Sequence, residues 1–250
     1  MSQKQKTKKG ARSEAGDFPQ EESPVSGERT EQINETGSVI VSGNGATIHC
    51  LTIIGQIEGH YVLPPQNKIT KYEHVIPQLI AVEEDDNIDG LLLILNTVGG
   101  DVEAGLAIAE LISGMKKPTV SLVLGGGHSI GIPLAVAAKK SFIAKSASMT
   151  VHPVRSSGVM VAVSQTFDYY RKMQNRITEF VAANSKITKE RYLQLVMNTE
   201  ELVMDIGTIL EGEEAVEEGL IDSVGTISDA ISDLASQIKK RRRQTKNTKK

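Results

Sequence analysis

Gly125-Gly126-Gly127-His128-Ser129-Ile130-Gly131 joins an apolar run to a run of small apolar residues, and this junction decides how the chain folds around it. Residues 119–124 are apolar enough for a buried strand, and residues 132–138 predict a helix with Pro133 in its first turn. Ser129 therefore falls in a sharp strand-to-helix turn and matches the Gly-x-Ser-x-Gly pattern of nucleophilic serines. Glycine permits the backbone conformations that such a turn needs, and a helix N-terminus offers free N–H groups. The alternative is that small residues here only let the helix pack close to the strand.

The composition indicates an ordinary globular protein. The chain has 250 residues, of which 39% are hydrophobic and 24% charged, enough for one sizeable core. Its single cysteine, Cys50, excludes an internal disulfide and a multi-cysteine zinc site, and it suits a reducing cytosol. No apolar run is long enough to span a membrane, and no hydrophobic stretch follows the basic N-terminus as in a secretory signal. We therefore expect a cytoplasmic protein without an integral membrane segment.

The two ends of the chain are basic, although the net charge is −3. Residues 1–37 contain almost nothing apolar, so we expect a disordered tail. Residues 38–236 are expected to form the folded domain, followed by a basic tail over 237–250. Such tails could contact nucleic acid or anionic lipid, but solvated tails explain the same composition, so no nucleic-acid partner is expected.

Between these ends, strands and helices alternate. This order predicts an α/β fold of repeated βαβ units with a parallel sheet, and functional groups lie beyond the carboxyl ends of such strands. The continuous apolar run 90–96 is typical of a strand that is covered on both faces. The expected strands are 38–41, 47–54, 90–96, 119–124, 141–144, 148–152 and 220–224. The expected helices are 72–82, 102–112, 132–138, 164–184, 213–218 and one that begins after Thr188.

A serine hydroxyl becomes a nucleophile only when a positioned base removes its proton, so the question is which histidine can reach Ser129. His152 ends the strand 148–152 and precedes Pro153, and strand ends commonly present catalytic groups. His128 neighbours Ser129 and is poorly placed to share its hydrogen bond. The other three lie in a strand, a loop and a helix: His49, His60 and His74. His152 is thus the preferred base, with a surface or structural role as the alternative.

A carboxylate that orients the base would complete a catalytic triad. Asp101 begins a helix, Asp168 lies on a helix face, and Asp222 follows an apolar pair, so each has a simple structural explanation. Asp205 is polar within an apolar stretch, which hints at a buried partner. Separately, the backbone N–H groups at Gly99-Gly100 could stabilise an oxyanion, or the pair could form a plain tight turn.

Four segments together resemble the ClpP serine peptidase family (family S14), over roughly residues 48 to 225. They are Asn96-Thr97-Val98-Gly99-Gly100, the 29-residue step from Gly100 to Ser129, Met149-Thr150-Val151-His152-Pro153, and residues 214–222. The segments 54–60 and 125–131 most closely resemble its translocation-enhancing, TepA-type branch. The resemblance implies the ClpP/crotonase superfold with C-terminal helices, assembly into homo-oligomeric rings around a chamber, and no cofactor.

Carried over by residue, the resemblance implies Ser129 as nucleophile, His152 as base, and the backbone N–H groups of Gly100 and Ile130 as oxyanion donors. The family's acid position falls on Gly207 when counted without gaps from residues 214–216, so Asp205 is the acid only if this loop has a two-residue insertion. Otherwise the site is incomplete or a dyad. The chain also departs from the family at Thr97-Val98, where Ser-Pro is usual, and at His128, where a small residue is usual.

Three functions fit these residues. The favoured one is a serine endopeptidase that hydrolyses peptides or unfolded proteins, with a role in protein quality control or export. The second is a ring protein of weak or absent catalysis that assists protein translocation. The third, an acyl-CoA enzyme of the crotonase type, needs neither Ser129 nor His152. The sequence leaves open whether an ATPase unfoldase or export machinery binds the ring.

Overall fold

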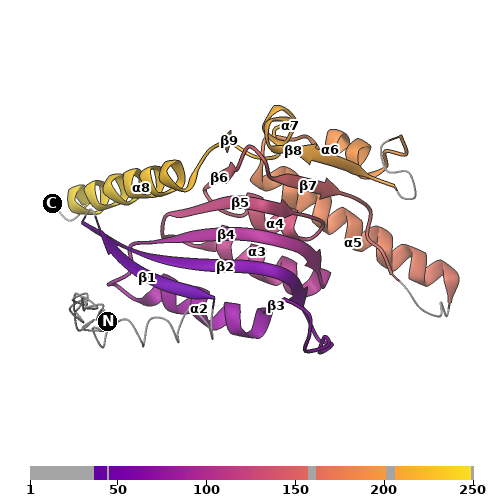
Figure 1. Cartoon of the computed structure of the whole chain (residues 1–250), viewed down its shortest axis with the longest axis horizontal. Coiled ribbons are helices and arrows are strands. Elements are labelled where there is room, and N and C mark those ends of the chain that lie inside the picture. The colour runs from indigo at the N-terminus through magenta and orange to yellow at the C-terminus, as the bar shows by residue number, and fades with distance from the viewer. Residues whose placement is uncertain (1–36, 44, 157–161, 201–205, 249–250) are drawn as a thin grey trace, which may run out of the picture.

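The chain forms a mixed α/β structure built on one sheet (Figure 1). The computed structural model describes residues 37–43, 45–156, 162–200 and 206–248. The central strands run parallel in the order β2-β4-β5-β6-β9, and β1 pairs antiparallel with β2 at the edge. Their bounds are β1 (Ser38–Gly43), β2 (Ala46–Glu58), β4 (Gly90–Gly100), β5 (Thr119–Gly127), β6 (Lys140–Ile143) and β9 (Ser223–Val224). The predicted α/β fold of repeated βαβ units is confirmed.

Helices cover both faces of this sheet, which explains the apolar run in β4. Leu91, Leu93 and Leu95 join a core formed with α2 (Tyr72–Glu84), α3 (Val102–Gly114) and α4 (Gly131–Val136). Leu92 points to the opposite face, into a second, smaller core. A strand that is buried on both sides has no polar face, so its sequence lacks alternation.

The C-terminal half adds the elements that flank the predicted site. The strand β7 (Ser148–Val151) pairs with β5 through Gly126 and Ser148, and antiparallel with β8 (Thr208–Glu211). The helix α5 (Val163–Asn184) extends away from the sheet, and α6 (Lys189–Val196) and α7 (Gly212–Glu217) lie near β8 (Figure 1). The expected cap of α6 is present, since the Thr188 side chain accepts a hydrogen bond from Arg191 N–H. Two short strands were not expected: β8, and β3 (Ile69–Lys71), which pairs with β2.

The C-terminal region forms a helix where the sequence analysis expects a tail. The helix α8 runs over Ile227–Thr248, so the domain boundary expected after residue 236 falls inside it. Ala230, Leu234 and Ile238 recur every fourth residue and are buried in the smaller core against β4 and β5. The sequence alone does not reveal this stripe, because its apolar members are few and widely spaced and the basic run 239–243 follows them.

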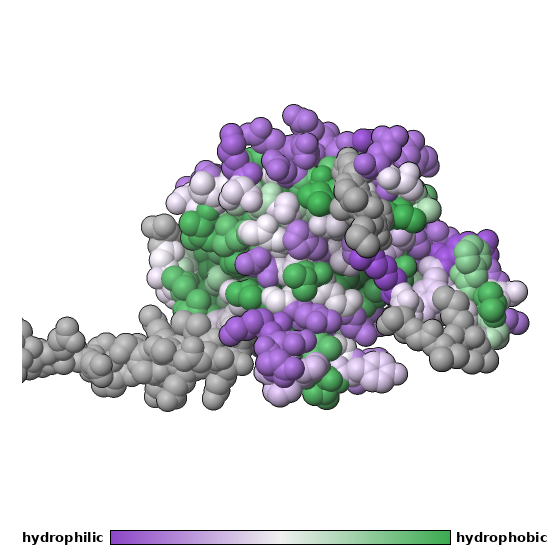
Figure 2. Space-filling view, turned by 45° about the vertical axis from the view of Figure 1, so that its right-hand side comes forward, coloured by the Kyte–Doolittle hydropathy of each residue, from purple (hydrophilic) through white to green (hydrophobic). Residues whose placement is uncertain are grey.

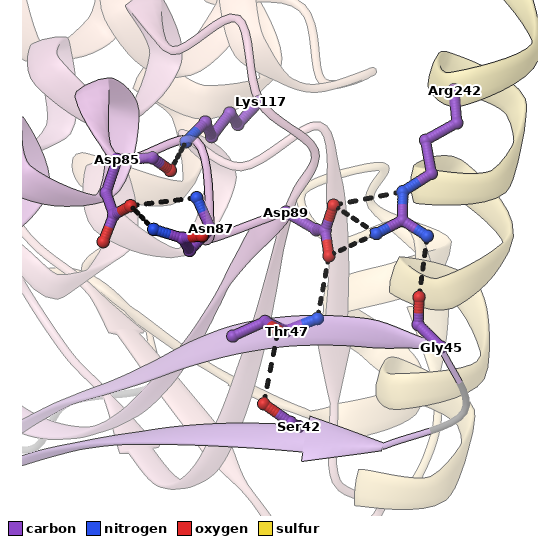
Figure 3. A network of polar contacts seen from close by, with 8 residues as sticks. All are labelled: Ser42, Gly45, Thr47, Asp85, Asn87, Asp89, Lys117 and Arg242. Atoms are coloured by element: carbon purple, nitrogen blue, oxygen red, sulfur yellow. Dashed lines mark hydrogen bonds and ion pairs between the residues drawn. The ribbon is translucent and has the colours of Figure 1, made fainter.

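Arg242 continues the same stripe and fastens α8 to the sheet (Figure 3). Its guanidinium donates to both carboxylate oxygens of Asp89, at 2.7 Å each, and to the carbonyl oxygen of Gly45, at 2.7 Å. Asp89 also accepts from Thr47 N–H at 2.8 Å. A planar guanidinium suits such a forked contact. The basic part of α8 is therefore hydrogen-bonded through Arg242 to Asp89 and to the turn between β1 and β2.

None of the helices in the described ranges is both long enough and apolar enough to cross a membrane.

Candidate active site

Ser129 lies in a strained turn between β5 and α4. Its φ angle of 56° is in the left-handed region, which is uncommon for a residue other than glycine. Three backbone hydrogen bonds hold the turn: Ser129 N–H donates to Thr150 O at 2.9 Å, Gly131 N–H to His128 O at 2.8 Å, and Ile132 N–H to Ser129 O at 3.0 Å. This is the geometry of a nucleophile elbow, in which strain exposes the serine hydroxyl at the end of a strand.

The glycine pair at the end of β4 lies directly against this serine. A Cβ atom on Gly99 would lie 2.7 Å from Ser129 Cβ and 3.2 Å from Ser129 Oγ, closer than packing allows. A Cβ atom on Gly100 would overlap the backbone of Ile57 in β2. Both glycines also have positive φ angles, 89° and 153°. The close approach to Ser129 favours the site over a plain tight turn, because only a bare backbone fits there.

Thr97, which stands where Ser is usual in the family pattern, connects the glycine pair to the elbow. Its buried hydroxyl accepts from Gly99 N–H at 3.0 Å and donates to Gly55 O at 2.6 Å. Its carbonyl oxygen accepts from His128 N–H at 3.1 Å. A hydroxyl that both donates and accepts is needed here, which Thr and Ser share, so a Ser-to-Thr change preserves the contact.

Ile130 N–H is the backbone donor that the elbow leaves for a ligand. Its neighbours Ser129 N–H and Gly131 N–H are both used within the turn. Among the described residues, Ile130 N–H has no hydrogen-bond acceptor. It lies at the N-terminus of α4, where the helix dipole favours negative charge. Such a donor beside a serine hydroxyl suits an oxyanion.

His152 follows β7 directly, and a backbone hydrogen bond joins this strand to the elbow. Thr150, two residues earlier, accepts the hydrogen bond from Ser129 N–H. The pKa of His128 is lowered by burial and, secondarily, by the charge of His152, so the two rings lie within electrostatic range. His152 Nδ1 lies 2.7 Å from the carbonyl oxygen of Pro153. Because a carbonyl only accepts, Nδ1 carries the proton, and Nε2 then has the lone pair that a base requires.

His49, His60 and His74 all lie away from the elbow. His60 Nδ1 lies 3.1 Å from the Tyr72 hydroxyl, and His74 is exposed on α2. His49 is buried in β2, and burial lowers its pKa. The preference for His152 among the five therefore agrees with their positions, although its catalytic role stays a prediction.

Asp205, the expected acid, lies outside the described residues. Gly207, onto which the family's acid position falls without gaps, packs against His152: a Cβ atom there would lie 2.9 Å from His152 Cβ. The three alternative carboxylates have partners elsewhere. Asp101 caps α3 by accepting from Ala104 N–H, Asp168 pairs with Arg171, and Asp222 accepts from Ser141 and pairs with Lys186. Gly207, which packs on His152, follows Asp205 by two residues in the sequence.

Apolar side chains are exposed at the same end of the sheet. Val98, beside the glycine pair, is 65% exposed, and Ile54 and Leu124 on the neighbouring strands are also exposed. Figure 2 shows hydrophobic residues gathered on one face of the molecule between hydrophilic groups above and below. Exposed apolar clusters mark binding surfaces more often than plain surface does.

Within the described ranges, His, Cys, Asp and Glu side chains form no group of three that could hold a metal ion.

A comparison with models of known protein families identifies the class of protein to which this fold and this elbow belong. Residues 45–228 match the Clp protease family, which is most of the chain, so the chain belongs to that family. The resemblance inferred from the sequence is confirmed.

Individual relatives are consistent with this assignment. The chain is 54% identical over 224 residues to the translocation-enhancing protein TepA of Halalkalibacterium halodurans, covering 89% of this chain and 87% of that protein. It is 30% identical over 215 residues to the putative protease MJ0651 of Methanocaldococcus jannaschii, covering 71% of this chain and 64% of that protein. It is 26% identical over 156 residues to an ATP-dependent Clp protease proteolytic subunit of Lactococcus lactis subsp. cremoris, covering 60% of this chain and 74% of that subunit.

Proposed function

We propose that the chain is a serine endopeptidase that hydrolyses peptide bonds of peptides or unfolded proteins. The observation that carries the proposal is the contact between Ser129, in a strained elbow, and Gly99, with Thr150 joining the elbow to the strand that precedes His152. These contacts support the proposal because they join the proposed nucleophile to the glycine pair of β4 and to the strand that precedes the proposed base. Packing alone does not require a left-handed serine.

In the proposed reaction, Ser129 Oγ attacks the carbonyl carbon of the substrate while His152 Nε2 takes the hydroxyl proton. The carbonyl oxygen becomes an oxyanion that accepts from Gly100 N–H and Ile130 N–H. The C–N bond then breaks, His152 gives its proton to the leaving amine, and Ser129 holds the acyl group. Water attacks this ester as His152 takes its proton, and the acid leaves when the proton returns to Ser129.

Asp205 is proposed to orient His152. Its support is the packing of Gly207 on His152, because Asp205 precedes Gly207 by only two residues. The Pro153 carbonyl already holds the proton on His152 Nδ1, so the acid would add to an orientation that the backbone provides in part. By family resemblance, the active form is proposed to be a homo-oligomeric ring in the cytoplasm. An ATPase unfoldase or export machinery would then deliver the substrate.

A second candidate is a ring protein that assists translocation with little or no catalysis. The name of the relative from Halalkalibacterium halodurans favours it.

A fluorophosphonate probe separates these candidates. The purified full chain should form one covalent adduct, and peptide mapping by mass spectrometry should locate it on Ser129. Since the probe reacts only with an activated serine, labelling requires both the base and the oxyanion donors. Size determination in solution on the same sample identifies the assembly that reacts. A folded oligomer that stays unlabelled would reject the peptidase and leave the second candidate.

Gly99→Ala should slow probe labelling and peptide hydrolysis by ~100-fold, because the new Cβ displaces the Ser129 side chain by a substantial fraction of an ångström. The φ angle of 89° at this position adds strain of ~1–2 kcal/mol, so the melting temperature should also fall. Gly114→Ala is the matched control, since a Cβ at Gly114 meets nothing within 4 Å. Equal labelling rates for the Gly99 variant and wild type would contradict the close contact.

A further inference from the structure

His128, the residue before Ser129, uses its ring to hold the strand that leads to His152. Thr150 N–H donates to His128 Nδ1 at 3.0 Å, and the Thr150 hydroxyl oxygen lies 2.9 Å from the same nitrogen. The far side of the ring packs on Gly126, where a Cβ atom would lie 2.5 Å from His128 Nε2. The ring is therefore fixed between β5 and β7 rather than directed into solvent.

Thr150 also makes a backbone hydrogen bond to the elbow. Its carbonyl oxygen accepts from Ser129 N–H at 2.9 Å. Residues 128 and 129 of the elbow are thus both bonded to Thr150, His128 through its side chain to the Thr150 N–H and Ser129 through its backbone N–H to the Thr150 carbonyl. A residue with a short side chain before the serine could make only the second of these bonds.

The His128 ring also extends a very short strand pairing. The strands β5 and β7 pair at a single position, Gly126 with Ser148. Two residues further along both strands, the partners in the same register are His128 and Thr150. There the elbow turns the backbone away, and the imidazole supplies the acceptor that a backbone carbonyl would supply in a longer ladder. The bond between Thr150 N–H and His128 Nδ1 therefore takes the place of a missing backbone hydrogen bond between the strands, two residues before His152.

The contact defines the protonation state of the ring. Nδ1 accepts from a backbone N–H, so it carries no proton, and the neutral ring has its proton on Nε2. Burial lowers the pKa of His128, and the nearby charge of His152 lowers it further, which favours this neutral form. A protonated ring would turn the acceptor into a donor opposite another donor.

We propose that His128 is a positioning residue that holds Thr150, and through it the β7 end, so that His152 meets Ser129. This role rests on the proposed peptidase function. It also gives a reason for the departure from the small residue that the family usually has at this position. The substrate does not contact the ring in this role, so binding and turnover should respond differently to its loss.

The test compares two substitutions of His128 in the full chain. His128→Ala removes the acceptor and should lower kcat by ~10–100-fold with little change in KM, as expected when a catalytic group is misplaced. His128→Asn keeps an acceptor at the position of Nδ1, since Asn Oδ1 lies at the same distance along the side chain, and should stay within ~3-fold of wild type. His74→Ala, on the exposed face of α2, is the matched histidine control and should equal wild type.

Two results would overturn the positioning role. One is a His128→Ala variant that reacts with the fluorophosphonate and turns over peptide as fast as wild type. The other is an Ala and an Asn variant that lose activity equally and only in proportion to their unfolded fraction at the assay temperature, which indicates a merely structural residue.

Imidazole ¹⁵N chemical shifts test the contact without any activity. They should report His128 as the neutral tautomer with the proton on Nε2, and this state should persist below the pH at which an ordinary histidine is protonated, because burial lowers the pKa of His128. A proton on Nδ1 at neutral pH would reject the proposed contact. A folded wild-type chain that is never labelled would instead reject the peptidase function, and the positioning role with it.

Discussion

Ser129→Ala should abolish fluorophosphonate labelling and lower peptide hydrolysis by at least ~10³-fold. The hydroxyl is the only group in the proposed mechanism that forms the bond to the substrate, so nothing replaces it. The residual rate comes from the backbone donors alone. Peptide cleavage at a fixed concentration of folded protein is the measurement, and Ser232→Ala, on the exposed side of α8, is the control.

A glycine at the same position distinguishes catalysis from folding. Ser129→Gly should be equally inactive, but it removes the strain of a left-handed residue with a φ angle of 56°. The free energy of unfolding should therefore rise by about 1 kcal/mol relative to the Ala variant. Residual hydrolysis that equals wild type in either variant would show that another group attacks the substrate.

The α/β core could be predicted because its signals are local. The run in β4, the periodic apolar face of α2 and the turn at Ser129 each lie within about a dozen residues. The strands β3 and β8 were not predicted, since each is defined by its pairing with a strand remote in sequence, β3 with β2 and β8 with β7. The helix α8 was missed for a different reason. Its stripe of Ala230, Leu234 and Ile238 continues into Arg242, whose partners, Asp89 and the Gly45 carbonyl, are remote in sequence.

The candidate site was predictable to the extent that motifs carry it. The turn motif, the strand end and the family resemblance pointed to Ser129, His152 and Gly100, and the structure brings the segments that contain them together. The side chains that connect these segments were not predictable. Thr97 and His128 looked like departures from a pattern, because their partners, Gly55 and Thr150, are remote in sequence. The polar contacts of a site thus depend on the register between strands, which single-strand patterns do not contain.

His152→Ala should lower kcat by ~10³–10⁴-fold while the fold is unchanged. Without a base, Ser129 keeps its proton and attacks slowly, although the oxyanion donors are intact. In wild type, hydrolysis should decline toward acidic pH because a protonated imidazole accepts no proton. The variant should lose this acidic limb, since the group that titrates there has been removed. Activity within 10-fold of wild type would reject His152 as the base.

Asp205→Asn measures how much the acid adds to the backbone contact of His152. If the Pro153 carbonyl alone kept the proton on Nδ1, the substitution would have no effect, and the site would be a dyad. We expect instead a loss of ~10–100-fold, smaller than that of the His152 variant. The carbonyl preserves the tautomer, but a neutral amide cannot stabilise the imidazolium that forms during attack. Asp168→Asn, which removes only the partner of Arg171 on α5, is the matched control and should equal wild type. A loss as large as that of His152→Ala would mean that the carbonyl contributes nothing to the orientation of the base.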